Sequence, residues 1–327
     1  MSRADGVDFV HQPVMPAEVV GLLAEAPAGM ILDATVGGGG HARALLEASA
    51  AHQVIGIDQD PLAVAAARAA LAPFGARARV LQARFDHLDD VLDALGIDRL
   101  SGALFDLGVS SPQLDRVERG FSYRGDGPLD MRMDPTRGRS AAEVVNTADE
   151  RELARWLAAS GERRFAGRIA RAIVAARPLR TTGELAEIVR AAIPAATRRS
   201  GGHPARRAFQ AIRIAVNEEL DVLPVALDAV IGRLLPGGRL VVLAYHSGED
   251  RIVKDRMVEA ATGGCTCPPA LPCACGATPT VRLLTRGARK PTTVEIERNP
   301  RAESARLRAV ERLWPAPGPD PGPGGGS

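Results

Sequence analysis

Two short segments combine glycines with acidic and imidazole side chains at spacings that suit a ligand pocket. The first is Ile31-Leu32-Asp33-Ala34-Thr35-Val36-Gly37-Gly38-Gly39-Gly40-His41, and the second is Val54-Ile55-Gly56-Ile57-Asp58. Each contains an apolar strand pattern, and Asp58 follows Gly40 by 18 residues. Glycines let the backbone approach a ligand closely, and an acid at the next strand end can accept hydrogen bonds from two ribose hydroxyls. The pattern therefore predicts a nucleotide pocket.

The chemistry of the residues around the turn narrows the choice of ligand. The spacing Gly37-x-Gly39-x-x-Ala42 also satisfies the dinucleotide fingerprint, so NAD stays open, as does a glycine turn that binds nothing. Asp33 and His41 suit a cofactor with a cationic amino-acid end better than a pyrophosphate, which needs bare N–H groups at a helix start. They favour S-adenosylmethionine.

A third segment is expected beside the same pocket. The strand Gly102–Asp106 leads into Leu107-Gly-Val-Ser-Ser-Pro-Gln113. Ligands of open α/β sheets bind at the carboxyl ends of strands, near the switch in strand order. We therefore expect Asp106 beside the glycine turn, and the hydroxyls and carbonyls of the Ser110-Ser111-Pro112 corner near the reactive end of the cofactor. The alternative is that Asp106 and Ser110 only cap the next turn.

The elements that hold these residues follow from alternating apolar runs and helical stretches. Strands are predicted to end at Ala34, Asp58, Ala83 and Asp106, with a fifth over Gly238–Ala244. Asp60 and Pro61 are predicted to begin a helix, and 234–238 a helix end followed by a turn. Strands separated by helices favour a doubly wound, mostly parallel α/β sheet with right-handed crossovers.

The stretch between the fourth and fifth strands changes character and is predicted to be an inserted all-helical domain. Thr147/Glu150 and Thr181/Glu184 have the spacing of capping boxes. Helices are predicted to stop at Gly161, Pro178 and Pro194. A last helix is predicted to begin at Pro204, with one apolar face formed by Phe209, Ile212, Val216 and Leu220. The expected organisation is an α/β domain over 8–111 and 221–313, the insertion over 112–220, and a disordered Pro/Gly tail over 314–327.

Charge within the insertion points to an anionic partner. Residues 130–213 hold 17 arginines against nine acidic residues, although the whole chain carries a net charge of only +2. Two groups stand out, namely Arg163, Arg164, Arg168 and Arg171, and then Arg198, Arg199, Arg206 and Arg207. We expect them to contact nucleic acid, the alternative being an arginine-rich solvated face.

Composition places the chain among ordinary globular proteins, with 46% hydrophobic and 24% charged residues. No apolar run is long enough to span a bilayer, and the N-terminus lacks the apolar segment of a signal peptide. The expectation is a cytoplasmic protein with no membrane partner.

Four cysteines form Cys265-x-Cys267 and Cys273-x-Cys275 in a Pro-rich loop. Clustered thiols suggest zinc, but each pair encloses one residue where structural sites usually have two to four. The expectation is no metal, and a loop of free or redox-responsive thiols.

Longer motifs around these residues resemble the bacterial RsmH (MraW) family, which methylates N4 of a cytosine in 16S ribosomal RNA. The shared stretches cover almost the whole chain, apart from the extreme N-terminus, the cysteine loop and the tail. They include residues 106–115, 119–122, 127–135 and 209–213, together with His11-Gln-Pro-Val, His203-Pro204, His246-Ser247 and Asn299-Pro-Arg301.

The resemblance implies S-adenosylmethionine as methyl donor, a Rossmann-like methyltransferase domain and an insertion that meets RNA. It implies Gly39, Gly40, His41, Asp58, Phe85, Asp106 and Gln113 as cofactor residues. Asp58 would accept hydrogen bonds from the ribose hydroxyls, Phe85 would pack on the adenine, and Asp106 or Gln113 would hydrogen-bond to polar parts of the cofactor. The expected partner is 16S rRNA within the small ribosomal subunit, and a homodimer stays open.

The catalytic residues are less sharply indicated. The corner Ser111-Pro-Gln-Leu114 lacks the aromatic that amino-methylating enzymes typically stack on the base, so Phe121 or Tyr123 is expected to supply it. Ser111 and His246 are the expected catalytic residues, His246 as proton acceptor or, equally, as a hydrogen-bonded structural histidine. The rivals are an NAD-dependent oxidoreductase, a ribosome-assembly factor without catalysis, and a DNA cytosine methyltransferase.

Overall fold

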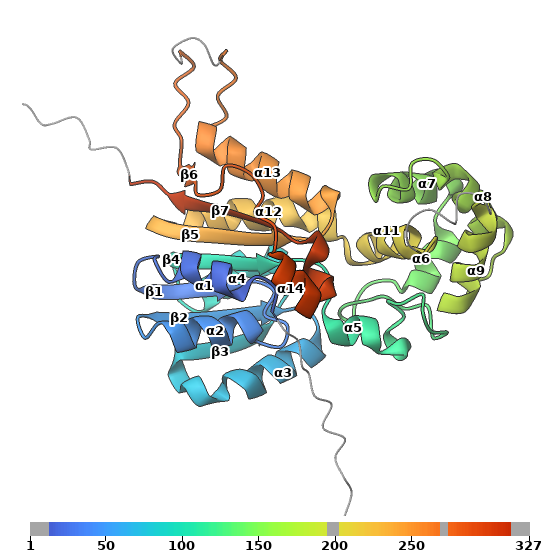
Figure 1. Cartoon of the computed structure of the whole chain (residues 1–327), viewed down its shortest axis with the longest axis horizontal. Coiled ribbons are helices and arrows are strands. Elements are labelled where there is room, and N and C mark those ends of the chain that lie inside the picture. The colour runs from blue at the N-terminus through green and yellow to red at the C-terminus, as the bar shows by residue number, and fades with distance from the viewer. Residues whose placement is uncertain (1–12, 195–202, 269–273, 315–327) are drawn as a thin grey trace, which may run out of the picture.

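The computed structural model describes residues 13–194, 203–268 and 274–314. His11, Arg198, Arg199, Cys273 and the tail after Trp314 lie outside these ranges. A central sheet has the strand order β3-β2-β1-β4-β5-β7-β6 (Figure 1). The strands are β1 (Gly29–Asp33), β2 (His52–Asp58), β3 (Ala78–Gln82), β4 (Leu100–Asp106), β5 (Leu234–Ala244), β6 (Val281–Leu283) and β7 (Arg306–Arg312).

The first five strands are parallel, which confirms the predicted doubly wound, mostly parallel sheet. Their predicted ends are correct to within one residue. β6 and β7 were not predicted, and they add antiparallel pairs to the β5 edge. Strand order reverses between β1 and β4, so the ends of these two neighbours form the switch point where α/β sheets bind ligands.

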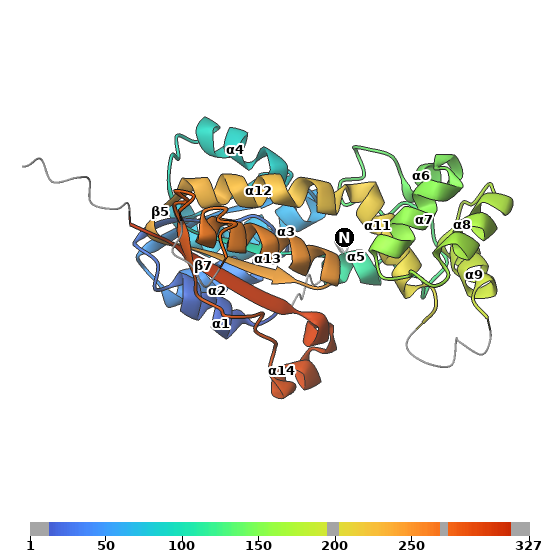
Figure 2. The same ribbon diagram turned by 90° about the horizontal axis from the view of Figure 1, so that it is seen from above.

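Helices cover both faces of the sheet (Figure 2). They are α1 (Pro16–Leu23), α2 (Gly40–Ala48), α3 (Pro61–Leu71), α4 (Leu88–Ala94), α12 (Glu219–Arg233) and α13 (Ser247–Thr262). Alternate strand residues pack on opposite faces. Leu32 and Phe105 lie in the core under α4, α12 and α13, whereas Ile31 and Leu104 lie in the core under α1, α2 and α3.

The predicted start of α3 is confirmed, because the Asp60 carboxylate accepts from the Leu62 backbone N–H at 3.0 Å. The predicted turn at 234–238 is wrong. β5 begins directly at Leu234, which pairs with Leu100, and a register shift precedes the pairing of Gly102 with Arg239. Gly237, with a φ of 79°, accommodates this irregularity within the strand.

A helical cluster with its own core occupies most of the region between β4 and β5. Its helices are α5 (Ser111–Asp115), α6 (Ala141–Thr147), α7 (Glu150–Ala159), α8 (Ala166–Ala175), α9 (Thr182–Ala192) and α11 (Arg206–Asn217). Buried residues from Phe121 to Ile212 form its core, separate from the two sheet cores. In both views α6–α9 stand apart from the sheet, with α5 and α11 nearer to it (Figures 1 and 2).

Capping explains how these helices begin. Thr181 and Glu184 form the predicted box, with N···O distances of 3.2 and 3.1 Å. The box predicted at Thr147 is wrong, because the Thr147 hydroxyl donates to the Glu143 carbonyl within α6. Asp149 and Glu152 cap α7 instead, at 2.8 and 3.1 Å.

The last predicted helix is interrupted. α11 ends at Asn217, and Glu218 adopts a left-handed φ of 54° before α12 starts. Leu220 therefore belongs to the next helix and does not extend the apolar face of Phe209 and Ile212.

Candidate functional site

A cleft of about 1230 Å³ lies where the sheet meets the helical cluster. Most of the predicted cofactor and catalytic residues line it: Gly40, His41, Asp58, Phe85, Asp106, Ser111, Gln113 and His246. Phe121 and Tyr123 line it too. The cleft thus joins the carboxyl ends of β2, β4 and β5 to the helical cluster.

Gly39 is the one predicted cofactor residue that is not among the lining residues. Its φ of 84° is left-handed, and a Cβ there would lie 3.3 Å from the Leu71 side chain. Gly39 therefore lets the turn pack closely on α3. Gly40 has a similar constraint, because a Cβ would lie 3.2 Å from the Pro13 ring.

Asp58 is fixed by the turn that it faces. Its Oδ2 accepts from the Gly37 backbone N–H at 3.0 Å, and its Oδ1 accepts from the Asp60 N–H at 2.9 Å. Burial raises the pKa of Asp58 to about 6, outweighing these two hydrogen bonds, which lower it. Above that pH the carboxylate is ionised and can accept from ligand hydroxyls.

His41, at the start of α2, is buried beside Asp106. Its Nε2 lies 3.3 Å from Asp106 Oδ2, while its Nδ1 has no hydrogen-bond partner among the described residues. Burial lowers the pKa of His41, but the adjacent Asp106 carboxylate, together with the charges of Asp33 and Glu295, outweighs burial and the net shift is upward. A buried imidazole with one unsatisfied nitrogen is suited to a polar ligand group.

Asp106 is held from a third direction by a residue that the sequence analysis did not single out. The Tyr245 hydroxyl donates to Asp106 Oδ1 at 2.6 Å, and the Asp106 N–H donates to the Thr35 hydroxyl, also at 2.6 Å. Burial and the adjacent carboxylate raise the pKa of Tyr245 well above its ordinary value, so the phenol stays protonated. Tyr245 and Asp106 both line the cleft.

Asp33 lies behind this group. It is buried, and it lines a small gap with His41 but does not line the cleft itself. Burial raises its pKa to about 7, against the opposing charge of His41. The expectation that Asp33 meets a cationic cofactor end directly is therefore not supported. Its carboxylate instead accepts from the backbone N–H of Thr35, a residue that lines the cleft, at 3.3 Å.

Phe85 and Gln113, the other two predicted cofactor side chains, differ in the contacts that they already make within the protein. Phe85 is half-buried and meets Phe105 edge to face, with ring centroids 5.7 Å apart. Both polar atoms of the buried Gln113 amide already have partners. Nε2 donates to Asp60 Oδ2, and Oε1 accepts from the Ser110 N–H, each at 2.9 Å. Gln113 therefore ties the corner around Ser111 to the start of α3.

His246 caps α13. Its Nδ1 accepts from the backbone N–H groups of Gly248 and Glu249, at 3.1 and 3.4 Å. An accepting Nδ1 leaves the proton of a neutral ring on Nε2, which lies 3.1 Å from Glu249 Oε1. Although burial opposes it, contact with His246 lowers the pKa of Glu249. The geometry favours the structural alternative for His246.

The helical cluster contributes an aromatic group to the opposite side. Tyr123 stacks on His203, with centroids 4.4 Å apart and planes 11° apart, and meets Phe209 edge to face at 5.8 Å. Phe121 is buried beneath Arg119. Of the two predicted stacking residues, Tyr123 is the more accessible, and its partner His203 was not foreseen in this role.

The arginines predicted to bind an anion differ in whether they line the cleft or contact other side chains. Arg206 is exposed on the cleft. Arg171 and Arg207 lie 3.5 Å from Glu150 and Glu162, and Arg164 lies over the Phe165 ring. A further exposed cation, Arg124, lines the cleft next to Tyr123.

A C-terminal segment also reaches the cleft. Residues after α14 (Thr293–Arg298), including Asn299, Pro300 and Arg301, line it, and Arg301 pairs with Asp115 of α5 at 2.7 Å. The sequence signal was the Asn-Pro-Arg motif, which the family resemblance contained but to which no role had been assigned.

Comparison with known proteins gives one consistent family. A model described as the MraW methylase family matches residues 8–313. The protein named ribosomal RNA small subunit methyltransferase H from Thermobifida fusca is 55% identical over 309 residues, covering 92% of this chain and 93% of the relative. The protein of the same name from Heliobacterium modesticaldum is 51% identical, covering 93% and 99%.

A solved rRNA methylase from Streptococcus thermophilus aligns with a TM-score of 0.41 at 11% identity, covering 91% of this chain and 95% of that one. Within the described residues, the helices fall short of the length and apolar character that a bilayer crossing requires.

Proposed function

The chain belongs to the MraW methylase family, and from this premise we propose that it methylates N4 of a cytosine in 16S ribosomal RNA, with S-adenosylmethionine as donor. The named relatives match over nearly their whole length. The observation that carries the proposal is a cleft in which the predicted nucleotide-binding residues of the sheet face aromatic and cationic residues of the helical cluster.

The residues on the sheet side fit the cofactor. Asp58 offers an oriented carboxylate at a strand end, and His41 offers a buried nitrogen that lacks a partner among the described residues. We assign the ribose hydroxyls to Asp58, the adenine to Phe85, and the remaining polar groups to the backbone at Gly40 and to His41 and Asp106. Gly39 and Gln113 would shape the pocket, Gly39 by packing the turn on α3 and Gln113 by tying the Ser110 corner to Asp60. When bound, S-adenosylmethionine supplies a methyl group on a cationic sulfur.

The helical side fits single-stranded RNA. Exposed Arg124 and Arg206 suit phosphates, and the face of Tyr123 not covered by His203 suits a base lifted from its stack. The inserted domain, over 112–220, would then be the part that meets RNA, with the small ribosomal subunit as its context and the bacterial cytoplasm as its location.

Residues near Ser111 would position the reacting nitrogen. The lone pair of a cytosine amino group is delocalised into the ring, so rate enhancement must come from orientation and hydrogen bonding. Ser111, at the first position of α5, can accept from the amino group through its hydroxyl. Since His246 Nδ1 already accepts from two backbone N–H groups, we assign His246 to holding Glu249 and the strand end, and the leaving proton to water.

The test is methyl transfer from isotopically labelled S-adenosylmethionine to small subunits, and to naked 16S rRNA, from cells that lack the gene. Digestion to nucleosides and mass spectrometry should find labelled N4-methylcytidine. Label in another nucleoside would overturn the assignment. RNA binding without any label would favour an assembly factor, equal labelling of a DNA analogue would favour a DNA enzyme, and NADH binding would favour an oxidoreductase.

A further inference from the structure

The connection between α13 and β6 is a loop whose two limbs touch at their base. Gly263 ends α13 with a φ of 63°, and a Cβ there would lie 2.5 Å from the Thr278 backbone. Further from the tip of the loop than that contact, the Thr280 N–H donates to the Ala260 carbonyl at 2.9 Å. The backbone therefore holds the start and the end of the loop side by side.

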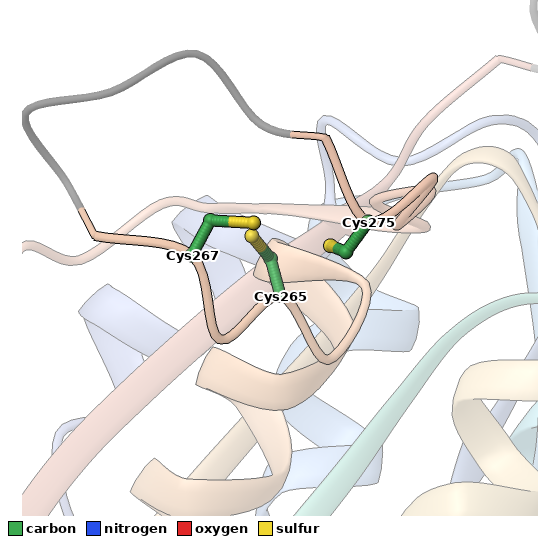
Figure 3. Close-up of side chains that lie close together, drawn as sticks. All are labelled: Cys265, Cys267 and Cys275. Carbon is green, nitrogen blue, oxygen red and sulfur yellow. The ribbon is translucent and has the colours of Figure 1, made fainter.

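This closure brings three cysteines together. Cys265 and Cys267 follow Gly263 on one limb, and Cys275 precedes Thr278 on the other. Their sulfur atoms all lie within 4.8 Å of one another. Figure 3 shows Cys275 facing Cys265 and Cys267 from the opposite limb. No other group of three or more His, Cys, Asp or Glu side chains in the described ranges has its ligand atoms this close.

The sulfur positions suit a tetrahedral ion. With Zn–S bonds of about 2.3 Å, the sulfurs of a tetrahedral site stand roughly 3.8 Å apart. Spacings of up to 4.8 Å reach that value by small side-chain rotations. Cys265 and Cys267 are half-buried and Cys275 is exposed, so an ion can enter without opening the core.

We propose that Cys265, Cys267 and Cys275 bind one zinc ion as thiolates. Binding releases one proton from each thiol, and a further donor completes the four-coordinate shell. This differs from the sequence-based expectation of no metal, which rested on the single residue between Cys265 and Cys267. The contact between the limbs supplies the third ligand from a distant position, which the spacing within a pair cannot reveal.

The position of the site indicates a structural role. α13 has 16 residues, so its two ends lie about 24 Å apart. His246 at its start borders the cleft, whereas the cysteines follow its last turn, and the described limbs of the loop project beyond the sheet (Figure 1). A zinc ion here would join the limbs of the loop, far from the reacting groups.

The test uses the full chain, purified under reducing conditions and analysed for metal. We expect about one zinc per chain and, after exchange, a cobalt(II) form with thiolate-to-metal charge-transfer absorption. Cys265→Ser combined with Cys275→Ser should lose both signals. Thr266→Ala, which changes the residue between two ligands but leaves every sulfur in place, should keep both.

Two results would overturn the proposal without any variant having to fold. One is that reduced wild-type protein takes up less than about 0.1 equivalent of zinc from a micromolar buffered solution. The other is a cobalt spectrum that lacks thiolate charge transfer. As independent support, chelation of the wild-type metal should increase protease cleavage between Gly263 and Pro279 and leave the rest of the chain intact.

Discussion

The hydroxyl of Tyr245, just after β5, donates to the carboxylate of Asp106 at the end of β4, with 2.6 Å between the oxygens. The other carboxylate oxygen lies 3.3 Å from Nε2 of His41, at the start of α2. Three elements therefore meet at one carboxylate on the cleft. The orientation of the Asp106 carboxylate therefore depends on Tyr245 and His41, which lie outside its own strand.

Tyr245→Phe keeps the aromatic ring and removes only the donor to Asp106. Because the Asp106 carboxylate then loses its fixed orientation toward the cofactor, the Kd for S-adenosylmethionine should rise by up to the energy of that hydrogen bond, about 1.5–3 kcal/mol, which is roughly 10- to 150-fold. Isothermal titration calorimetry measures it. An unchanged Kd in a variant with a wild-type melting temperature would remove this contact from cofactor binding.

Asp58→Asn should weaken the binding of S-adenosylmethionine by about 1.5–3 kcal/mol, because an amide replaces the carboxylate that accepts hydrogen bonds from the ribose hydroxyls. The wild type should also lose affinity as the pH falls through about 6, where Asp58 gains a proton. Because burial raises the pKa of Asp58, mildly acidic pH is enough to protonate its carboxylate. The comparison is Kd between pH 5 and 8 in both proteins. A wild-type pH slope that persists in Asp58→Asn would assign the titration to another group.

Arg206→Gln should weaken RNA binding and reduce the dependence of log K on log salt by about one phosphate contact. The matched control is Arg171→Gln, since Arg171 is exposed on the same helical cluster but does not line the cleft. Cofactor affinity should be unchanged in both. Equal losses in the two variants would mean that the cluster binds RNA by diffuse charge and not through the cleft.

His246→Asn separates the two roles of this residue. Asparagine is a good helix cap but cannot take up a proton, so turnover should stay within about tenfold of wild type if His246 only positions Glu249 and α13. A fall of about 10²–10⁴-fold in single-turnover transfer, in a protein that melts normally, would establish a general base. His246→Ala, which also removes the cap, should lower the melting temperature as well.

Local sequence patterns were sufficient to predict the parts of the site that lie at strand ends. Asp58 and Asp106 follow buried apolar runs, so both their strands and their meeting at one edge could be predicted. Contacts between distant segments could not. Tyr245 and Asp106 are 139 positions apart, and Tyr123 stacks on a histidine 80 positions later.

Neighbouring polar residues also compete for the same role. Thr147 and Asp149 could each cap α7, and only the hydrogen bond of Thr147 to its own helix decides between them. The cysteine loop shows the same limit, because the closeness of Cys265 and Cys275 comes from the contact of Gly263 with Thr278.

The most direct measurement is mass mapping of modified nucleosides in small-subunit rRNA from cells with and without the gene. We predict one N4-methylated cytidine that disappears on deletion, returns with the wild-type gene and does not return fully with Asp58→Ala. A modification profile that is identical in the two strains, or the loss of a methyl group from any other base, would contradict it.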